Sequence, residues 1–239
     1  MTLQGKTDIG KLRKLNEDAF DFGTFADGAC WAVVCDGMGG AKGGQVASGL
    51  AVQTIRNRFE TSYRPEMDAR SVRNLLLCAA EAANAAILAR AKEDETLTGM
   101  GTTAVAAIIC GSRVSLLHVG DSRAYLLDGA EIRQLTRDHS VVQELVESGK
   151  ITQEDAHSHP QKNIITKALG VVEPLSYDYD EVELPAGAKL LLCTDGLTNM
   201  LRDEEILEIS KQEDIAETLV QRAVELGGVD NVTVVLACL

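Results

Sequence analysis

Residues 102–135, TTAVAAIICGSRVSLLHVGDSRAYLLDGAEIRQL, contain four short apolar runs separated by turn residues. Gly-Ser, Gly-Asp-Ser and Asp-Gly stand between the runs at the spacing typical of β-hairpins. This stretch therefore predicts an antiparallel meander of four strands. Other elements have to cover the apolar face of such a sheet, so the flanking segments decide the fold class.

Apolar residues at helical spacing predict two pairs of helices, one pair before this stretch and one after it. The helices are expected at 45–59, about 68–92, about 203–211 and about 214–226. The other apolar runs, before residue 36 and at 175–184, 188–193 and 231–238, are predicted strands. Because strands and helices do not alternate strictly, an α+β fold is favoured. Two packed antiparallel sheets flanked by helix pairs would bury every apolar face, so we expect one domain over residues 1–239, a four-layer α-β-β-α sandwich.

Residues 139–170 interrupt the pattern of strands. A short amphipathic stretch that begins at Val141 is followed by Thr152, which precedes the sequence QEDA as a helix cap would, and then by Pro160. We expect a flap here that shapes substrate access and choice.

The composition disfavours several classes of partner. The 239 residues carry a formal net charge of -13, whereas nucleic acids and anionic membranes bind basic surfaces. No apolar run approaches the roughly 18 residues of a membrane span. The six cysteines form no Cys-x-x-Cys pair and mostly lie in apolar stretches, as buried reduced thiols do. We expect a monomeric, cytoplasmic protein with no membrane span.

Four apolar runs each meet an aspartate at one end, namely Asp36, Asp121, Asp195 and Asp230. A buried strand should not end in a charge unless that end opens onto solvent, a cation or a site. If three such carboxylates met within about 4 Å, each pair would repel by roughly 4 kcal/mol at an effective dielectric constant of 20. Divalent cations would relieve this repulsion, and oxygen-only ligands suit magnesium or manganese better than zinc. Gly37 and Gly196 follow two of these aspartates, and an Asp-Gly pair alone could be an ordinary turn, but the set of four aspartates favours a metal site.

Six ordered motifs extend this observation over almost the whole chain. They are GKLRKLNEDA at 10–19, VCDGMGG at 34–40, GTT at 101–103, VGDSRAY at 119–125, CTDGL at 193–197 and DNVTV at 230–234. The chain thereby resembles the type 2C metal-dependent protein serine/threonine phosphatases, the PPM family, particularly their compact bacterial members. The resemblance implies the same sandwich, with two magnesium or manganese ions at one edge and a bridging water or hydroxide that attacks phosphorus directly.

The resemblance also implies a set of metal ligands. Asp36 would bridge both ions, and Asp195 and Asp230 would complete the site of one ion. The carbonyl of Gly37 would serve the other ion, together with Glu17 directly or through water.

Three further roles come from the same resemblance. Asp18 would orient the bridging water, and Asp121 with Asp195 would hold a third ion found in bacterial members. Arg13 would bind the substrate phosphate, since a guanidinium presents a rigid fork of donors to phosphate oxygens. Without its context, Arg13 among two lysines could be a solvated base, and Asp121 could be a hairpin corner.

The histidines fit this pattern poorly. Family members often carry a histidine shortly after the first metal aspartate as a general acid, and here Met38 and Ala41 occupy the candidate positions. Water would then protonate the leaving group, or the group would depart without the help of an acid. The four histidines are expected in three places: His118 in the core, His139 at the start of the flap where it could approach substrate, and His157 and His159 at the surface.

The sequence thus predicts a phosphatase that acts on phosphoserine and phosphothreonine in proteins and opposes a cognate serine/threonine kinase. Two alternatives remain open: a regulatory pseudophosphatase that binds phosphoproteins without turnover, and a hydrolase of small phosphoesters. Retention of Asp36, Asp195 and Asp230 argues against the first alternative.

Overall fold

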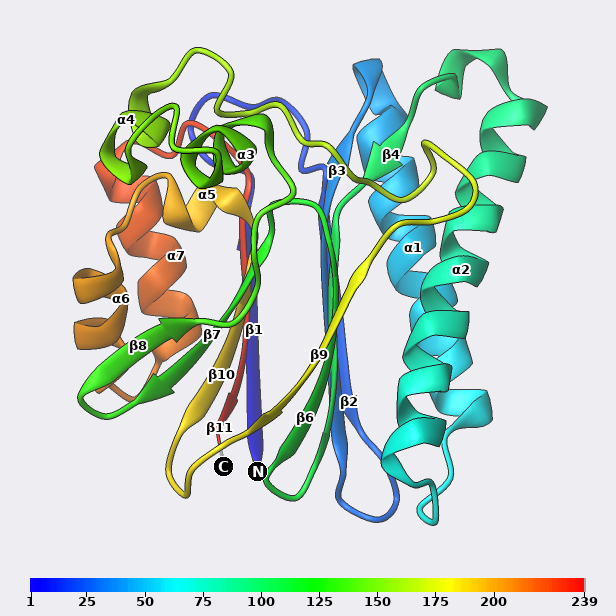
Figure 1. Ribbon diagram of the computed structural model, residues 1–239, viewed down its shortest axis with the longest axis vertical. Helices are drawn as coiled ribbons and strands as arrows, with labels where there is room; N and C mark the ends of the chain where they lie inside the picture. The colour runs from blue at the N-terminus through cyan, green and yellow to red at the C-terminus, as the bar shows by residue number, and fades with distance from the viewer. Residues whose placement is uncertain (239) are drawn as a thin grey trace.

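Two antiparallel sheets pack face to face at the centre of the molecule (Figure 1). The computed structural model describes residues 1–238, and for Gly40, Ala41 and His157 it describes the backbone alone. The first sheet has the strand order β1 (Thr2–Asp8), β11 (Val232–Cys238), β10 (Lys189–Cys193), β7 (Arg123–Asp128), β8 (Glu131–Gln134). The second has the order β2 (Asp18–Thr24), β3 (Cys30–Met38), β5 (Ala104–Cys110), β6 (Arg113–Val119), β9 (Asp178–Glu183), and β4 (Gly101–Thr102) pairs with the end of β3.

Helices cover the outer face of each sheet, which confirms the predicted four layers (Figure 1). The long helices α1 (Gly40–Ser62) and α2 (Ala69–Glu93) lie on the second sheet, and the 3₁₀ turn η1 (Glu95–Leu97) follows them. The first sheet is covered by α5 (Asp195–Thr198), α6 (Asp203–Ile209) and α7 (Ile215–Leu226). The segment between β8 and β9 carries the short helices α3 (Val141–Glu147) and α4 (Gln153–Ser158).

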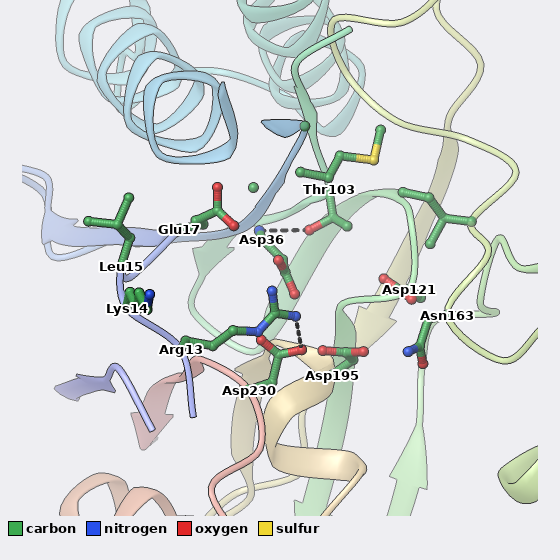
Figure 2. Close-up of a pocket in the computed structure, with 14 residues that line it drawn as sticks. Arg13, Lys14, Leu15, Glu17, Asp36, Thr103, Asp121, Asn163, Asp195 and Asp230 are labelled. Carbon is green, nitrogen blue, oxygen red and sulfur yellow. Dashed lines mark hydrogen bonds and ion pairs between the residues drawn. The ribbon is translucent and has the colours of Figure 1, made fainter. Parts of the chain in front are cut away.

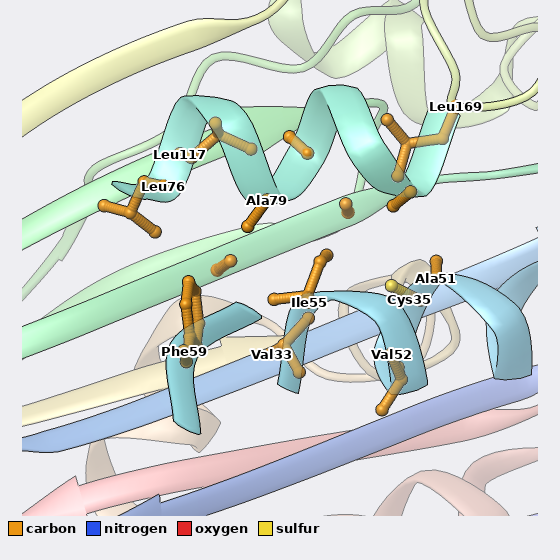
Figure 3. Close-up of a cluster of buried hydrophobic side chains, with 14 of the residues drawn as sticks. Val33, Cys35, Ala51, Val52, Ile55, Phe59, Leu76, Ala79, Leu117 and Leu169 are labelled. Atoms are coloured by element: carbon orange, nitrogen blue, oxygen red, sulfur yellow. The ribbon is translucent and has the colours of Figure 1, made fainter. Parts of the chain in front are cut away.

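Apolar side chains fill the three spaces between these layers. The space between the second sheet and its helices holds Phe59, Ile55 and Leu76, all nearly inaccessible to solvent (Figure 3). A second cluster lies between the first sheet and α6 and α7. The third cluster joins the two sheets and includes Val34 and Leu192. Burial on both faces explains why the central strands are continuous apolar runs.

The predicted four-stranded meander is wrong at one step. β5 pairs with β6 and β7 pairs with β8, but β6 belongs to the second sheet and β7 to the first. The chain crosses between the sheets at residues 120–122. The turn residues there are compatible with a hairpin, so they do not reveal the change of sheet. The chain crosses because the two strand pairs are buried on opposite sides of the central core. As a result, Asp121 lies at the edge where the two sheets meet.

Element boundaries differ from the predictions in few places. Helix α1 begins at Gly40 rather than Gln45, because the glycine-rich start has low helix propensity and hides the boundary. The sequence also gave no sign of the short helix α5, and β9 is shorter than the predicted run at 175–184. The cap at Thr152 is confirmed, since its hydroxyl accepts from the amide of Asp155 at 3.1 Å.

The structure bears on two expectations from composition. Helix α2 is long and apolar enough, on average, to cross a membrane, although its apolar face packs against the second sheet in the core. All six cysteines are free thiols, but not all are buried, since Cys78 lies on the exposed face of α2.

Candidate active site

A cavity of about 530 Å³ opens at the edge where the two sheets meet (Figure 2). The cavity walls combine carboxylates, two basic residues and a few apolar side chains. They are formed by Arg13, Lys14, Leu15, Glu17, Asp36, Gly37, Met38, Gly39, Thr103, Asp121, Asn163, Ile165, Asp195 and Asp230. All residues predicted for metal and phosphate binding therefore line one cavity, whereas Asp18 lies behind its wall.

Asp36 is held at the end of β3 by two threonines that precede β5. Its amide donates to the hydroxyl of Thr103 at 2.9 Å, and its carbonyl accepts from the amide of Thr103 at 2.9 Å and from the hydroxyl of Thr102 at 2.8 Å. The next residue is Gly37, where a Cβ would overlap the backbone of Gly44 in α1. Only glycine allows the strand end and the helix to approach this closely.

Asp18 lies opposite Asp36 in the register of β2 and β3. One of its carboxylate oxygens, Oδ2, accepts from the hydroxyls of Thr194 at 2.9 Å and Thr233 at 2.6 Å. The other oxygen, Oδ1, is buried and has no hydrogen-bond partner among the described residues. Such an orphaned acceptor indicates a place for a water molecule or an ion.

Arg13 reaches the cavity from the loop between β1 and β2. Its Nη2 donates to Oδ2 of Asp230 at 2.7 Å, and half of its side chain is exposed (Figure 2). Asn231 fixes this loop: its Nδ2 donates to the carbonyls of Ile9 and Leu15, and its Oδ1 accepts from the amide of Glu17. The strand end that carries Asp230 thus also positions Arg13.

Asp195 and Asp121 complete the carboxylate group. Asp195 begins α5, and its Oδ2 accepts from the side-chain amide of Asn199 at 2.9 Å. A Cβ at Gly196 would overlap the carbonyl of Asn231, so this glycine lets α5 start against the neighbouring strand end. Asp121 lies on the crossing between the sheets, across the cavity from Arg13 (Figure 2).

Positive charge near these carboxylates is limited: Arg13 pairs with Asp230, and Arg123 lowers the pKa of Asp121 and of Asp195 only against larger opposing effects. Burial raises the pKa of Asp36 well above its usual range, and the charges of Asp18 and Asp195 raise it further. Burial also raises the pKa of Asp121 to about 8 and that of Asp18 to about 7. For Asp195, burial and the charge of Asp230 raise the pKa, while hydrogen bonds with Asn199 and Asp36 oppose the rise. The carboxylates would all ionise at neutral pH only with cations beside them.

The donor set fits hard divalent cations such as magnesium and manganese. It consists of carboxylate oxygens and the carbonyl of Gly37, with no histidine or cysteine among the lining residues. Across the described residues, no three His, Cys, Asp or Glu side chains converge on a single point as ligands. Magnesium commonly keeps several waters and takes only one or two carboxylates, so pairs of these side chains suffice.

The other predicted positions have mixed outcomes. Met38 lines the cavity where a histidine general acid was considered, and the side chain of Ala41 lies outside the described part of the structure. His118 is a core residue as expected. His139 is buried and does not line the cavity, so the interpretation that it approaches substrate is wrong. His159 is half-buried rather than fully at the surface, and the side chain of His157 is not described.

Sequence reasoning missed the residues that support the aspartates. Thr103, Thr194, Thr233 and Asn231 hold the site through hydrogen bonds, and Asn163 of the flap segment lines it. Three of these residues lie in the motifs GTT and DNVTV. The sequence therefore marked their positions, but it did not reveal which residues they contact.

Comparisons with known proteins agree with this fold. The family model described as protein phosphatase 2C matches residues 11–228. A serine/threonine phosphatase, stp of Listeria monocytogenes, is 40% identical over 240 residues that cover 99% of this chain and 95% of the relative. The crystal structure of Stp1 from Staphylococcus aureus has a TM-score of 0.93 and 38% identity, covering 99% of this chain and 94% of that one.

Another similar structure contains bound metal. The catalytic domain of the serine/threonine phosphatase PstP in complex with two manganese ions has a TM-score of 0.83 and 34% identity, covering 98% of this chain and 96% of that one. Together with the fold and the carboxylate-lined cavity, these similarities show that the chain belongs to the protein phosphatase 2C family. Within this family it is a bacterial-type protein serine/threonine phosphatase.

Proposed function

We propose that the chain hydrolyses phosphoserine and phosphothreonine in proteins with the help of two divalent cations, manganese or magnesium, bound at the cavity. The observation that carries this proposal is the convergence of Asp36, Asp195 and Asp230 with Arg13 in one cavity. The two manganese ions bound by the similar PstP domain support it. Pairs drawn from Asp36, Asp195 and Asp230, completed by water, would hold one ion, and Asp36, the carbonyl of Gly37 and Glu17 would hold the other.

Bound cations would offset the charge of the phosphate and lower the pKa of water in the cavity. The side chains support water as the nucleophile, because no serine, cysteine or histidine lines the cavity among the described residues. Thr103 is the remaining hydroxyl there, and its oxygen already accepts from Asp36 and contacts Ser122 at 2.6 Å.

Two residues would orient the reactants. Arg13 would donate to phosphate oxygens, since only one of its guanidinium nitrogens is used by Asp230. Asp18 would accept a hydrogen bond from water at its unpartnered Oδ1. Asp121 and Asp195 would hold a third ion at the far side of the cavity.

The flap at about 139–170 would form one wall of the substrate site. Asn163 and Ile165 from this segment line the cavity, and the bridge between Ser140 and Ile165 ties its two ends together. Side chains beyond the phosphate would contact this wall, so the flap would influence substrate choice.

The reaction and the cysteines bear on partners and location. Opposition to a serine/threonine kinase follows from the reaction alone. Six free thiols suit the reducing cytoplasm, and we propose that the chain acts there as a monomer.

The central test compares the wild type with Asp36→Asn and Asp230→Asn on a phosphothreonine peptide, with manganese titrated. Each variant should lose about a hundredfold or more in kcat/KM, and EDTA should abolish activity. Asp128→Asn is the matched control, because Asp128 ends β7 outside the cavity and is exposed. Activity without metal, or unchanged activity in both site variants, would contradict the proposal. Small phosphoesters assayed in parallel distinguish the alternative substrate class.

The role of Arg13 predicts a specific kinetic change. Arg13→Lys keeps the charge but loses the planar fork, so KM for the peptide should rise about tenfold while kcat falls less. Lys14→Ala, which removes a neighbouring exposed charge, should change KM less than about threefold. Equal effects of the two substitutions would argue against a phosphate-binding role for Arg13.

A further inference from the structure

His139 connects the start of the flap segment to the residue before Asp121. Its ring nitrogen Nδ1 accepts from the amide of Gly120 at 3.0 Å, and its own amide donates to the carbonyl of Gly120 at 2.8 Å. The side chain is 6% exposed, so water does not compete strongly for these bonds. Both polar groups of the Gly120 backbone are therefore held by one residue.

The opposite side of the ring is fixed by the end of the flap segment and by β9. Because Nδ1 accepts a hydrogen bond, the neutral ring carries its proton on Nε2, which lies 3.1 Å from Oδ2 of Asp178 and 3.0 Å from Nζ of Lys167. Lys167 donates to Oδ1 of the same carboxylate at 3.0 Å. His118 stacks on the ring face with a centroid distance of 4.6 Å, and the amide of Thr166 donates to the carbonyl of His139 at 2.7 Å.

Gly120 lies in a conformation and a space that only glycine fits. Its φ of +107° is a conformation that favours glycine, and a Cβ there would overlap the side chain of Thr103. Thr103 also accepts from the amide of Asp36, so the Gly120 turn packs directly on the support of the central aspartate. The direction of the Asp121 side chain depends on the backbone that His139 holds.

We propose that His139 is a positioning residue for the phosphatase reaction, which fixes the Gly120 backbone so that the Asp121 carboxylate points into the cavity. His139 touches neither substrate nor reacting atoms and acts through Gly120. The inference rests on the proposed function in one respect, namely that Asp121 takes part in the reaction. It also explains why both ends of the flap segment meet at His139, since any movement of that segment is transmitted to Asp121.

Two substitutions separate the two sides of the ring. His139→Asn keeps an acceptor at the δ position for Gly120 and loses the contact with Asp178. His139→Gln can reach Asp178 but has no acceptor at the δ position. His159→Asn is the matched control in the same segment, because His159 accepts at Nδ1 only from the nearby amide of Gln161.

The expected result is a difference between these variants. His139→Gln should lower kcat by about tenfold and speed the exchange of the Gly120 amide proton measured by NMR, with weakened manganese binding in calorimetry. His139→Asn should stay within about threefold of wild-type kcat and keep the Gly120 amide protected. His159→Asn should match the wild type. Equal losses in His139→Asn and His139→Gln, or no loss in His139→Gln, would overturn the proposal.

Combination with Asp121→Asn separates this inference from the proposed function. If His139 acts through Asp121, then His139→Gln should lower kcat less than about twofold further in the Asp121→Asn background. If the effects of the two substitutions on kcat multiply in the double variant, the positioning role is overturned. If Asp121→Asn alone changes neither kcat nor manganese binding, the proposed role of Asp121 fails instead.

Discussion

At the scale of single residues, the carboxylates of the cavity differ in their surroundings. Asp230 pairs with the half-exposed Arg13, whereas Asp36 is partly buried among other acids. Asp18 is satisfied on one oxygen by two threonine hydroxyls and unsatisfied on the other. The same residue type therefore occupies three different environments, because the neighbours of each carboxylate differ.

His118 gives a residue-scale prediction about pH. Burial lowers its pKa to about 4, and the neighbouring His139 lowers it too, while Asp138 and Asp178 act in the opposite direction. In the unfolded chain the pKa is about 6.5, so between these values the unfolded state binds more protons and stability falls with falling pH. Between pH 7 and pH 5, the unfolding free energy of the wild type should fall by about 2 kcal/mol more than that of His118→Leu.

Urea unfolding of the wild type and His118→Leu at both pH values, in EDTA, measures this difference. Neither ring nitrogen of His118 has a hydrogen-bond partner among the described residues, so leucine sacrifices no such bond. An identical pH dependence in the two proteins would show that His118 does not titrate as its burial requires.

At the scale of elements, an ion pair joins strand β7 to the start of the flap segment. Arg123 donates through Nε and Nη2 to both carboxylate oxygens of Asp138, at 2.9 and 2.7 Å, and both side chains are largely buried. Arg123 also donates to the hydroxyl of Tyr125 at 3.0 Å. The segment that walls the cavity is therefore anchored at one end, while its partly exposed helices α3 and α4 contribute little to the core.

This anchor predicts a large effect of breaking the pair. Asp138→Asn leaves the guanidinium buried without its counter-charge, so the unfolding free energy should drop by about 3 kcal/mol. Hydrogen exchange should accelerate across residues 139–166. Glu147→Gln is the control, because Glu147 pairs with the exposed Arg137 in the same segment and should cost less than about 1 kcal/mol. Similar losses in the two variants would mean that burial of the Arg123 pair has no energetic role.

At the scale of the whole molecule, the core between the sheets couples the two helical layers. The apolar cluster there draws on strands from both sheets and includes Leu192, which is fully buried. Neither helix pair has a separate hydrophobic core that excludes the sheets. We therefore expect the chain to unfold as one unit.

Leu192→Ala tests this expectation. The cavity left by the leucine should lower the unfolding free energy by about 3 kcal/mol. The transition followed by fluorescence of the single tryptophan, Trp31, should coincide with the transition in far-ultraviolet circular dichroism, in both the wild type and the variant. Trp31 lies on the side of the second sheet that faces α1 and α2, so two separated transitions would show independent layers.

The sequence by itself determined the α+β class, the two helix pairs and the aspartates at strand ends, because periodicity and turn residues are local signals. It also carried the motifs that indicated a metal-dependent phosphatase. The tertiary structure alone decided that the chain changes sheets at Gly120, which brings Asp121 to the cavity. It likewise decided that His139 is buried at the start of the flap, and that Thr194 and Thr233 hold Asp18. These features join residues up to 215 positions apart, and only the packing of two sheets on a shared core selects such partners.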